Sequence, residues 1–316
     1  MSSELGAPAV LEATAVVVTL GPTEYLSRTL AALAAQDRAP AQVLLVDVVG
    51  GAALPAEAPP TWRLVPAPGA RTFGAAVAAA LDAVEVATPW LWFLHDDSAP
   101  EPGALAALLR AVEHAPSVGV AGAKQRTWGE PERLLEAGVT TSRFGRRMTG
   151  VGEEEVDQGQ LDGREDVLGV GTAGMLVRTD VWRELRGTDP ALGPYLDGLD
   201  LCRRARLAGH RVVVVPAAVV RHAQAGFLGL REGDPDHRRS FGARREALVH
   251  TQLSWVPLPY VPVLALVVLA AGVLRALWRV VTKEPGLAVA DLTAPVRVLA
   301  RPHRVAASRA RARRAR

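Results

Sequence analysis

Residues 90–105, WLWFLHDDSAPEPGAL, combine a strand-like apolar run with a pair of adjacent acidic residues, and this combination indicates the fold and the site. The stretch starts with an apolar run that ends at His95, as expected of a strand buried on both faces of a sheet. Two adjacent carboxylates, Asp96 and Asp97, follow this strand directly. Because two unpaired carboxylates are costly to bury, they predict a divalent cation with hard oxygen ligands, Mg²⁺ or Mn²⁺. The open alternative is a turn that caps a helix near Pro102.

The sequence from Ala15 to about Lys124 alternates short β-branched runs with Ala- and Leu-rich runs of helical spacing. This alternation predicts βαβ units, and therefore an α/β fold with a mainly parallel sheet flanked by helices. Strands are expected at 15–20, 42–49, 62–65, 90–95 and 118–123, and helices at 23–35, 72–86 and 102–113. The loops after Leu20, Asp47 and His95 should then meet at the carboxyl edge of the sheet, where such folds bind ligands.

The middle of the chain is less regular. Residues 125–167 contain the acidic loop GEEEVDQGQLDGRED, and we expect hairpins and a mobile loop there. Regular structure returns with a helix at 199–208. The strand expected in RVVVVPAAVVRHA, residues 211–223, should be stopped by Pro216, because proline cannot donate to a sheet ladder.

The C-terminal part has a different texture. Residues 255–274 carry no charge, and twenty helical residues rise about 30 Å, one bilayer core. We expect a transmembrane helix at 255–281, or an interfacial one because prolines interrupt its start. A basic juxtamembrane linker at 236–254 precedes it, and a basic tail at 282–316, either solvated or bound to anionic lipid, follows. Residues 1–14 should be disordered and, lacking the features of a signal peptide, cytoplasmic.

Composition and missing motifs exclude several classes of protein. The 316 residues are 49% hydrophobic and 22% charged, typical of a globular chain. The single cysteine, Cys202, allows no intramolecular disulfide, and there is no Cys/His cluster for structural zinc. The net charge is +3 and the last sixteen residues alone hold seven arginines, so nucleic-acid binding by the fold is not expected. Without a G-x-S-x-G motif or a P-loop lysine, hydrolase and NTPase functions have no support.

The order of these features resembles the family 2 glycosyltransferases, which have the Rossmann-like GT-A fold. The resemblance covers roughly residues 15–225 and implies a catalytic domain at 15–235 that binds a nucleoside diphosphate sugar. In that family the segments VVVTLGPTEYLSRTL and LLVDVVGG hold the nucleobase and ribose. The nucleotide contacts that the resemblance implies, including those at the helix opening TFGAAVAAAL, are Thr19, Leu20, Asp47, Arg71, Phe73 and Gly74.

The family's Asp-x-Asp motif falls on HDDSAP, with His95 where the first acid often stands. The resemblance implies that Asp96 faces the sugar or ribose and that Asp97 binds the metal. A second segment, GVGTAGMLVRTDVW, resembles the one that lines the donor sugar and acceptor, which implies a donor contact for Gly174. Its glycines also fit a dinucleotide fingerprint, but β-branched and basic residues follow where that motif needs a helix.

A third segment, PYLDGLDLCRRARLAGHRVVVVPAAVVRHAQAG, resembles the part of the family that supplies the general base. The acidic pair falls on Asp197 and Gly198, so glycine occupies the usual base position, and Asp197 or Asp200 remains as the candidate base. From the residues alone, the two aspartates also fit a helix-capping pair. By the same resemblance, His222 at the strand end is a metal ligand.

The implied reaction is metal-dependent transfer of the sugar to a hydroxyl with inversion. A cell-envelope glycan or lipid-linked acceptor is implied, because the apolar helix would hold the domain against membrane lipids on the cytoplasmic face. Four arginines before that helix could clamp the leaving diphosphate or lie on anionic headgroups: Arg238, Arg239, Arg244 and Arg245. The alternative is a non-catalytic glycosyltransferase-like scaffold or regulator in an envelope-assembly complex, which Gly198 and His95 favour.

Overall fold

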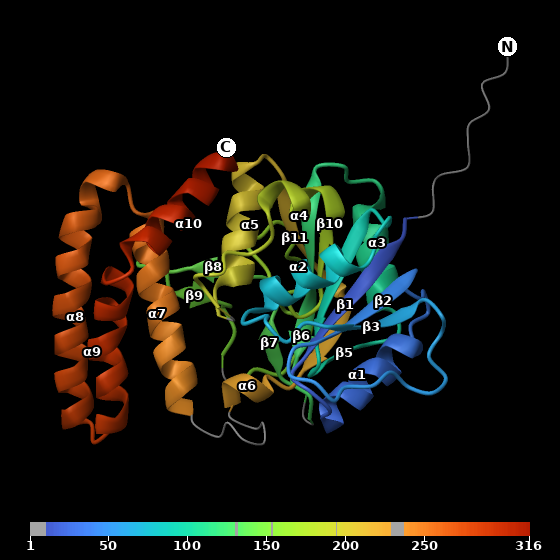
Figure 1. Cartoon of the computed structure of the whole chain (residues 1–316), viewed down its shortest axis with the longest axis horizontal. Helices are drawn as coiled ribbons and strands as arrows, with labels where there is room; N and C mark the ends of the chain where they lie inside the picture. Colours follow the sequence, from blue (N-terminus) through green and yellow to red (C-terminus); the bar gives the residue numbers. More distant parts are fainter. Residues whose placement is uncertain (1–10, 130–131, 153, 194, 229–236) are drawn as a thin grey trace, which may run out of the picture.

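The computed structural model describes residues 11–129, 132–152, 154–193, 195–228 and 237–316. Within them, a nine-stranded sheet lies among helices, and a further group of helices packs beside this domain (Figure 1). The strands of the sheet are β1 (Ala13–Thr19), β2 (Gln42–Asp47), β3 (Trp62–Pro66), β4 (Trp90–His95), β5 (Ser98–Pro100), β6 (Val118–Arg126), β7 (Leu134–Glu136), β10 (Met175–Arg178) and β11 (Arg211–His222). A separate hairpin is made by β8 (Thr140–Thr141) and β9 (Arg147–Met148). The helices are α1 (Glu24–Ala34), α2 (Phe73–Ala83), α3 (Ala104–Glu113), α4 (Thr179–Leu185), α5 (Asp197–Leu207), α6 (Ala225–Leu228), α7 (His237–Trp255), α8 (Val261–Val281), α9 (Pro285–Leu299) and α10 (Pro302–Arg314).

The strand order is β3-β2-β1-β4-β10-β6-β11-β5, with β7 paired to β6. Strands β1, β2, β3, β4, β6 and β11 point the same way, while β5, β7 and β10 run against them. The mainly parallel α/β sheet predicted from the sequence is therefore confirmed. Because β1 lies between β2 and β4, with Thr19 opposite Asp47 and Val18 opposite His95, the three loops that follow these strands meet at one edge.

Two apolar cores, one on each face of the sheet, hold the helices in place. On one face α1 and α3 pack through residues such as Leu30 and Leu108, and on the other α2 and α4 pack through Val77 and Trp182. Strand β1 contributes to both cores because successive side chains point to opposite faces. Both α1 and α2 start after a threonine whose hydroxyl accepts a backbone N–H, which fixes the helix starts next to the loops of the carboxyl edge.

Strand β11 does not stop at Pro216. Its pairing with β6 shifts register between Val215 and Val219, so the proline lies in a bulge where a missing N–H leaves no gap in the ladder. The strand then continues to His222. The expectation that Pro216 ends the strand was wrong, and the continuation is what carries His222 to the site.

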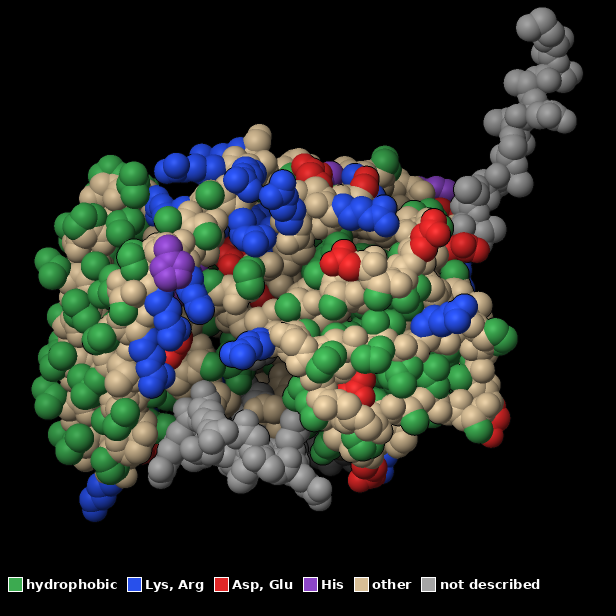
Figure 2. Space-filling model, in the orientation of Figure 1, with side chains coloured by type: hydrophobic (Ala, Val, Ile, Leu, Met, Phe, Trp, Pro, Cys, Tyr) green, Lys and Arg blue, Asp and Glu red, His purple; other side chains and the backbone are tan. Residues whose placement is uncertain are grey.

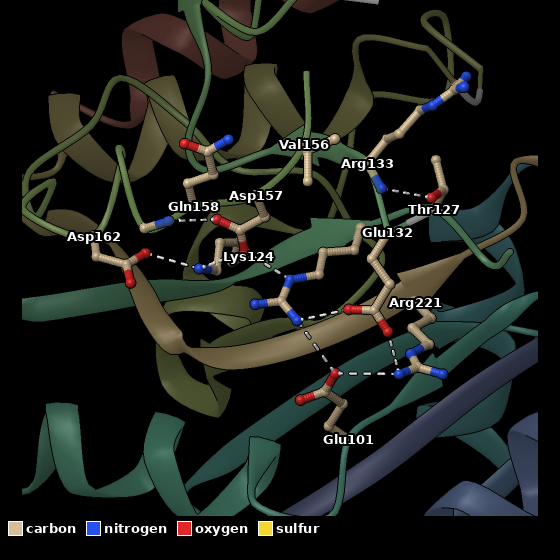
Figure 3. Close-up of polar contacts among 12 residues, drawn as sticks. Glu101, Lys124, Thr127, Glu132, Arg133, Val156, Asp157, Gln158, Asp162 and Arg221 are labelled. Carbon is tan, nitrogen blue, oxygen red and sulfur yellow. Dashed lines mark hydrogen bonds and ion pairs between the residues drawn. The ribbon is translucent and has the colours of Figure 1, made fainter. Parts of the chain in front are cut away.

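Ion pairs join the acidic loop to side chains of β6 (Figure 3). The buried ammonium of Lys124 on β6 lies 2.8 Å from Asp157 and 2.7 Å from Asp162, and Arg126 pairs with Asp157 at 2.7 Å. Burial alone would raise the pKa of Asp157, but the hydrogen bonds from Lys124 and Arg126 hold it below its usual value. The described part of the expected mobile loop is thus anchored by ion pairs; Glu153 lies outside the described residues.

The C-terminal segment is helical where a solvated tail was one expectation. Helices α9 and α10 each begin with a proline at the first helical position, which favours a helix start. The guanidinium of Arg309 on α10 donates to the carbonyl oxygens of Leu253, Ser254 and Val256 at the end of α7, so α10 caps that helix. At the other end of the chain, residues 1–10 lie outside the described residues.

Candidate functional site

A cavity of about 800 Å³ opens at the carboxyl edge of the sheet, between the ends of β1, β4 and β11 and the inner side of α7. This volume lies within the roughly 300–1,000 Å³ typical of ligand sites. The predicted site residues that line it are Leu20, Arg71, Phe73, Asp96, Asp97, Asp197 and His222. The sheet edge therefore brings together most of the predicted nucleotide, metal and catalytic residues in one cavity.

Asp97 and His222 form the centre of a candidate metal site. One carboxylate oxygen of Asp97 accepts the N–H of Ala225 at 2.7 Å, and the other lies 3.4 Å from Nε2 of His222. The far ring nitrogen of His222, Nδ1, lies 3.0 Å from the amide oxygen of Gln125, whose amide nitrogen donates to the carbonyl of Ala173. Because that amide oxygen can only accept, Nδ1 donates to it, which orients Nε2 of His222 toward Asp97.

His95 completes a cluster with Asp97 and His222, in which one ligand atom from each lies within 4.8 Å of the others. Adjacent ligands of an octahedral ion with bonds of about 2.1 Å stand roughly 3 Å apart, so the spacing of Asp97 and His222 fits a shared cation. Burial alone would raise the pKa of Asp97, but His222 and His95 hold it well below its usual range. Two imidazoles and an ionised carboxylate form a donor set suited to divalent transition ions.

His95 was not among the predicted metal ligands. The signal in the sequence was its place two residues before Asp97, where the family pattern often has an acid. Its ring stacks at a tilt 5.0 Å from Phe73 and lies edge-on 5.2 Å from His222, while Nε2 lies 2.9 Å from the hydroxyl of Thr172. Orientation toward the cavity depends on these tertiary contacts, which the sequence does not display.

Asp96 lies beside the metal cluster, with only 1% of its surface exposed. One of its oxygens accepts from the backbone N–H of Leu20 at 3.1 Å and from the hydroxyl of Thr19 at 3.2 Å. Thr19 itself is fully buried, so it acts through Asp96 and not by lining the cavity. The loop after β1 thus orients the first aspartate of the pair.

Asp47 is placed at the predicted edge, but its carboxylate is occupied by the turn that follows. Its two oxygens accept the backbone N–H groups of Val49, Gly50 and Ala52 at 2.8 to 3.1 Å. The neighbouring residue Val48 lines the cavity instead. Three bonds to backbone amides give Asp47 a structural task, and its contact with a nucleotide stays a prediction.

Gly74 and Gly174 serve close packing. A Cβ at position 74 would stand 1.8 Å from the hydroxyl oxygen of Thr188. At position 174 it would stand 2.8 Å from Val220 and 2.9 Å from Ala123, and the backbone has a positive φ of 85° that favours glycine. Neither glycine is among the residues that line the cavity, and a direct donor contact for either stays a prediction.

Asp197, at the start of α5, is the carboxylate of the cavity that keeps an unpaired oxygen. Its Oδ1 accepts the N–H of Gly198 at 2.9 Å, and its Oδ2 is buried without a hydrogen-bond partner among the described residues. Burial raises the pKa of Asp197 to about 7. The cap position of α5 is occupied by Leu196, so the capping role that the sequence left open does not apply.

Asp200 lies three residues further along α5 and has a different environment. It pairs with the buried guanidinium of Arg204 at 2.7 Å, and Arg204 also donates to the carbonyl oxygens of Leu185 and Gly187. The residue adjacent to the expected base, Gly198, is closely packed: a Cβ there would stand 3.0 Å from Thr172. Of the two aspartates predicted as catalytic, the structure therefore brings Asp197 to the cavity and ties Asp200 into the core.

The outer wall of the cavity is basic. It contains Phe241, Arg244 and Arg245 from α7, and Arg146 and Arg147 from the β8–β9 hairpin. The sequence did not predict the hairpin arginines as site residues, because the pattern of a short hairpin in an irregular segment does not indicate which surface its side chains face. For Arg244 and Arg245 the sequence left two roles open, a contact with the diphosphate or with lipid headgroups; both residues line the cavity. The side chains of Arg238 and Arg239 lie outside the described residues.

Solved structures with a similar fold include sugar transferases. GalNAc-T7 with UDP, GalNAc and Mn²⁺ is 11% identical, with a TM-score of 0.55 over 79% of this chain and 52% of that chain. Mannosyltransferase PcManGT from Pyrobaculum calidifontis in complex with GDP-Man and Mn²⁺ is 15% identical, with a TM-score of 0.51 over 92% of this chain and 88% of that chain. The chain spans about half the length of the GalNAc-T7 chain. At these identities the likeness establishes the GT-A fold.

The family is given by the sequence itself. Residues 9–244 match the family described as Glycosyltransferase like family 2, which is well over half of the chain. The chain therefore belongs to that family, a family of sugar transferases, as its motifs predicted. No curated protein sequence matches it.

Proposed function

We propose that this protein transfers a sugar from a nucleoside diphosphate sugar to a hydroxyl of a cell-envelope glycan or lipid-linked acceptor, with inversion, on the cytoplasmic face of the cell membrane. The observation that carries the proposal is Asp197, a buried carboxylate whose Oδ2 has no partner among the described residues, in the same cavity as Asp97 and His222. An unpaired buried carboxylate is costly, and such cost is typical of functional sites.

Asp197 is the general base in this proposal. A base is most effective when its pKa lies near the working pH, and the pKa of Asp197 is about 7. Its Oδ2 takes the proton of the acceptor hydroxyl while that oxygen forms a bond to the anomeric carbon of the donor sugar. The bond from the anomeric carbon to the diphosphate oxygen breaks, and the nucleoside diphosphate leaves with the electron pair.

His95, Asp97 and His222 would hold a divalent cation, which supplies charge stabilisation for the leaving diphosphate when bound. Imidazole nitrogens bind transition ions better than Mg²⁺, so we propose Mn²⁺ as the preferred of the two predicted ions. In this proposal Asp96, which Leu20 and Thr19 hold by hydrogen bonds, accepts a hydrogen bond from a sugar or ribose hydroxyl.

The basic wall supplies further positive charge. Arg71 and Arg244 line the same cavity as the metal cluster, and guanidinium groups bind phosphate oxygens well. The acceptor enters between this wall and Asp197 in the proposal. Support for a membrane setting comes from one apolar helical stretch, Leu258–Val281, of a length and composition that could cross a bilayer.

The test is a turnover assay on purified protein with Mn²⁺ and a panel of UDP-, dTDP- and GDP-sugars, with release of nucleoside diphosphate as the readout. We expect turnover with one donor, and a loss of roughly 10²–10⁴-fold in kcat for D197N with unchanged donor binding. The matched control is D82N, a charge removal on the exposed part of α2. If no donor is turned over, the non-catalytic scaffold is the better account; if D197N turns over as fast as D82N, Asp197 is not the general base.

A further inference from the structure

Helix α8 packs along its length against α9. Val268, Gly272 and Ala276, spaced four residues apart, form its buried side. Gly272 permits the closest approach, because a Cβ there would stand 2.7 Å from the carbonyl oxygen of Asp291 and 3.1 Å from Pro295. Helix α9 packs in turn on α7, and the three helices lie side by side in Figure 1.

An ion cluster locks these three helices together. Asp291 on α9 is 1% exposed and faces three arginines, with Arg245 of α7 at 2.8 Å and Arg275 and Arg279 of α8 at 3.4 and 3.5 Å. Arg245 also lines the catalytic cavity. The apolar helix is therefore joined through one buried aspartate to the wall of the site.

This arrangement conflicts with a membrane crossing by α8. A crossing helix would carry α7 and α9 alongside it, and would bring Asp291, Arg245 and the open cavity to the depth of the hydrocarbon. Charged groups at that depth are strongly disfavoured, and α9, with 15 residues, rises only about 22 Å. Pulling α8 away instead would leave Asp291 without two of its three cations.

The outer side of α8 is nevertheless strongly apolar. Leu266, Leu274 and Val281 are 70%, 67% and 72% exposed, and hydrophobic side chains cover this edge of the molecule in Figure 2. Two aromatic residues suited to a membrane interface, Tyr260 and Trp278, are exposed near its two ends. A continuous exposed apolar face of this kind marks a contact surface.

The charge of the C-terminal helices indicates which surface covers the exposed apolar side of α8. Residues 237–316 contain fifteen Lys and Arg and three Asp and Glu. Such an excess attracts anionic lipid headgroups, by about 1 kcal/mol for each cation near the surface. The surface that offers apolar depth and negative charge together is an anionic bilayer.

We propose that α8 lies in the plane of an anionic membrane surface, with its outer side in the boundary between headgroups and acyl chains, and does not cross the bilayer. Helix α9 packs against both α8 and α7, so the exposed side of α8 faces away from α9 and the cavity wall on α7. This inference rests on the packing of α7, α8 and α9 and is independent of the proposed reaction.

The test uses cysteines at the two ends of α8. The native Cys202 is fully buried and burial raises its pKa to about 12, so it gives little background labelling. Single variants L258C and K283C, both at exposed positions, are bound as full chains to sealed phosphatidylcholine–phosphatidylglycerol vesicles and treated with a membrane-impermeant maleimide. The control is R110C on the exposed side of α3. If α8 lies in the membrane plane, the reagent labels both L258C and K283C from outside, as it labels R110C. If α8 crosses the bilayer, one of the two cysteines is protected until detergent is added. That second result would overturn the proposal.

A second variant tests the docking face itself. The double change L266Q/L274Q alters side chains that project from the protein, so the melting temperature should stay unchanged. Vesicle binding should weaken by roughly a hundredfold, because two leucines lose their lipid contact. The paired control is L64Q/V156Q, which replaces two exposed apolar side chains of the sheet domain and should leave binding intact. Unchanged vesicle binding in L266Q/L274Q, or wild-type protein that does not float with vesicles, would also overturn the proposal.

Discussion

Asp197 and Asp200 stand three residues apart in the first turn of α5, yet Oδ2 of Asp197 has no hydrogen-bond partner among the described residues, whereas Asp200 pairs with Arg204. The difference follows from their directions. Asp197 lines the cavity, while Asp200 faces the next turn of the same helix, where Arg204 is four residues on. Two acids that the sequence leaves equivalent are thus separated into a functional and a structural carboxylate.

The unpaired carboxylate makes stability depend on pH. Asp197 has a pKa of about 7 in the folded chain, against an ordinary value of 3.8. Between these values the folded state holds a proton that the unfolded chain has lost, so stability falls as pH rises through this window, by up to about 4 kcal/mol. D197N should lack this decrease and be more stable than wild type at pH 8. Urea unfolding of both proteins at pH 5 and 8 checks it; parallel pH dependences would contradict the assignment.

The paired carboxylate should behave in the opposite way. D200N leaves the guanidinium of Arg204 buried without its counter-charge, which should cost about 3–5 kcal/mol of unfolding free energy. Denaturant unfolding at pH 7 measures the loss, with D82N as the surface control. A change below about 1 kcal/mol in D200N would show that Asp200 is not the structural member of the pair.

Gln125 should set the metal affinity without touching the metal. It accepts from Nδ1 of His222 and so directs Nε2 toward Asp97. Q125L should weaken Mn²⁺ binding by roughly 10–100-fold, the usual effect of removing such a support, while Q125E, which keeps the acceptor, should retain it. Electron paramagnetic resonance of free Mn²⁺ gives both affinities. Equal weakening in Q125L and Q125E would argue for loss of packing instead of loss of orientation.

His95 should determine which ion is preferred. With two imidazoles the wild type should bind Mn²⁺ more tightly than Mg²⁺, and H95D should narrow that difference because it replaces a nitrogen ligand by an oxygen. Competition of Mg²⁺ against bound Mn²⁺ measures the ratio. Pulsed electron paramagnetic resonance of bound Mn²⁺ detects each coordinated imidazole nitrogen. The number of such nitrogens should fall from two in the wild type to one in H95D. An unchanged number would show that His95 is not a metal ligand.

Most of the parallel sheet could be predicted because its strands are apolar runs bounded by helices of clear spacing. The order of the loops at the carboxyl edge followed from that pattern, and so did the positions of Asp96 and Asp97. The bulge at Pro216 could not be foreseen, because it depends on how β6 pairs with β11. The composition of a segment indicates whether it forms a strand, whereas a bulge depends on how two strands pair with each other.

The roles of single polar residues were harder to foresee, since each depends on a partner distant in sequence. The oxygens of Asp47 accept backbone N–H groups of the turn that follows, and its contact with a nucleotide stays a prediction. Asp200 was one of two candidates for the base, and it pairs with Arg204. His95 was noted only as a departure from the acidic motif, and the fold brings it to His222. Residue type predicts chemistry well, and only packing decides which group is left available for it.

In the proposed site, Asp97 anchors a cation that also binds the diphosphate of the donor. Calorimetric titration of the full chain with a nucleoside diphosphate, with and without Mn²⁺, measures this coupling. We predict binding that requires Mn²⁺ and that weakens by at least roughly a hundredfold in D97N, with D82N unchanged. Binding of equal strength without metal, or in D97N, would contradict the claim.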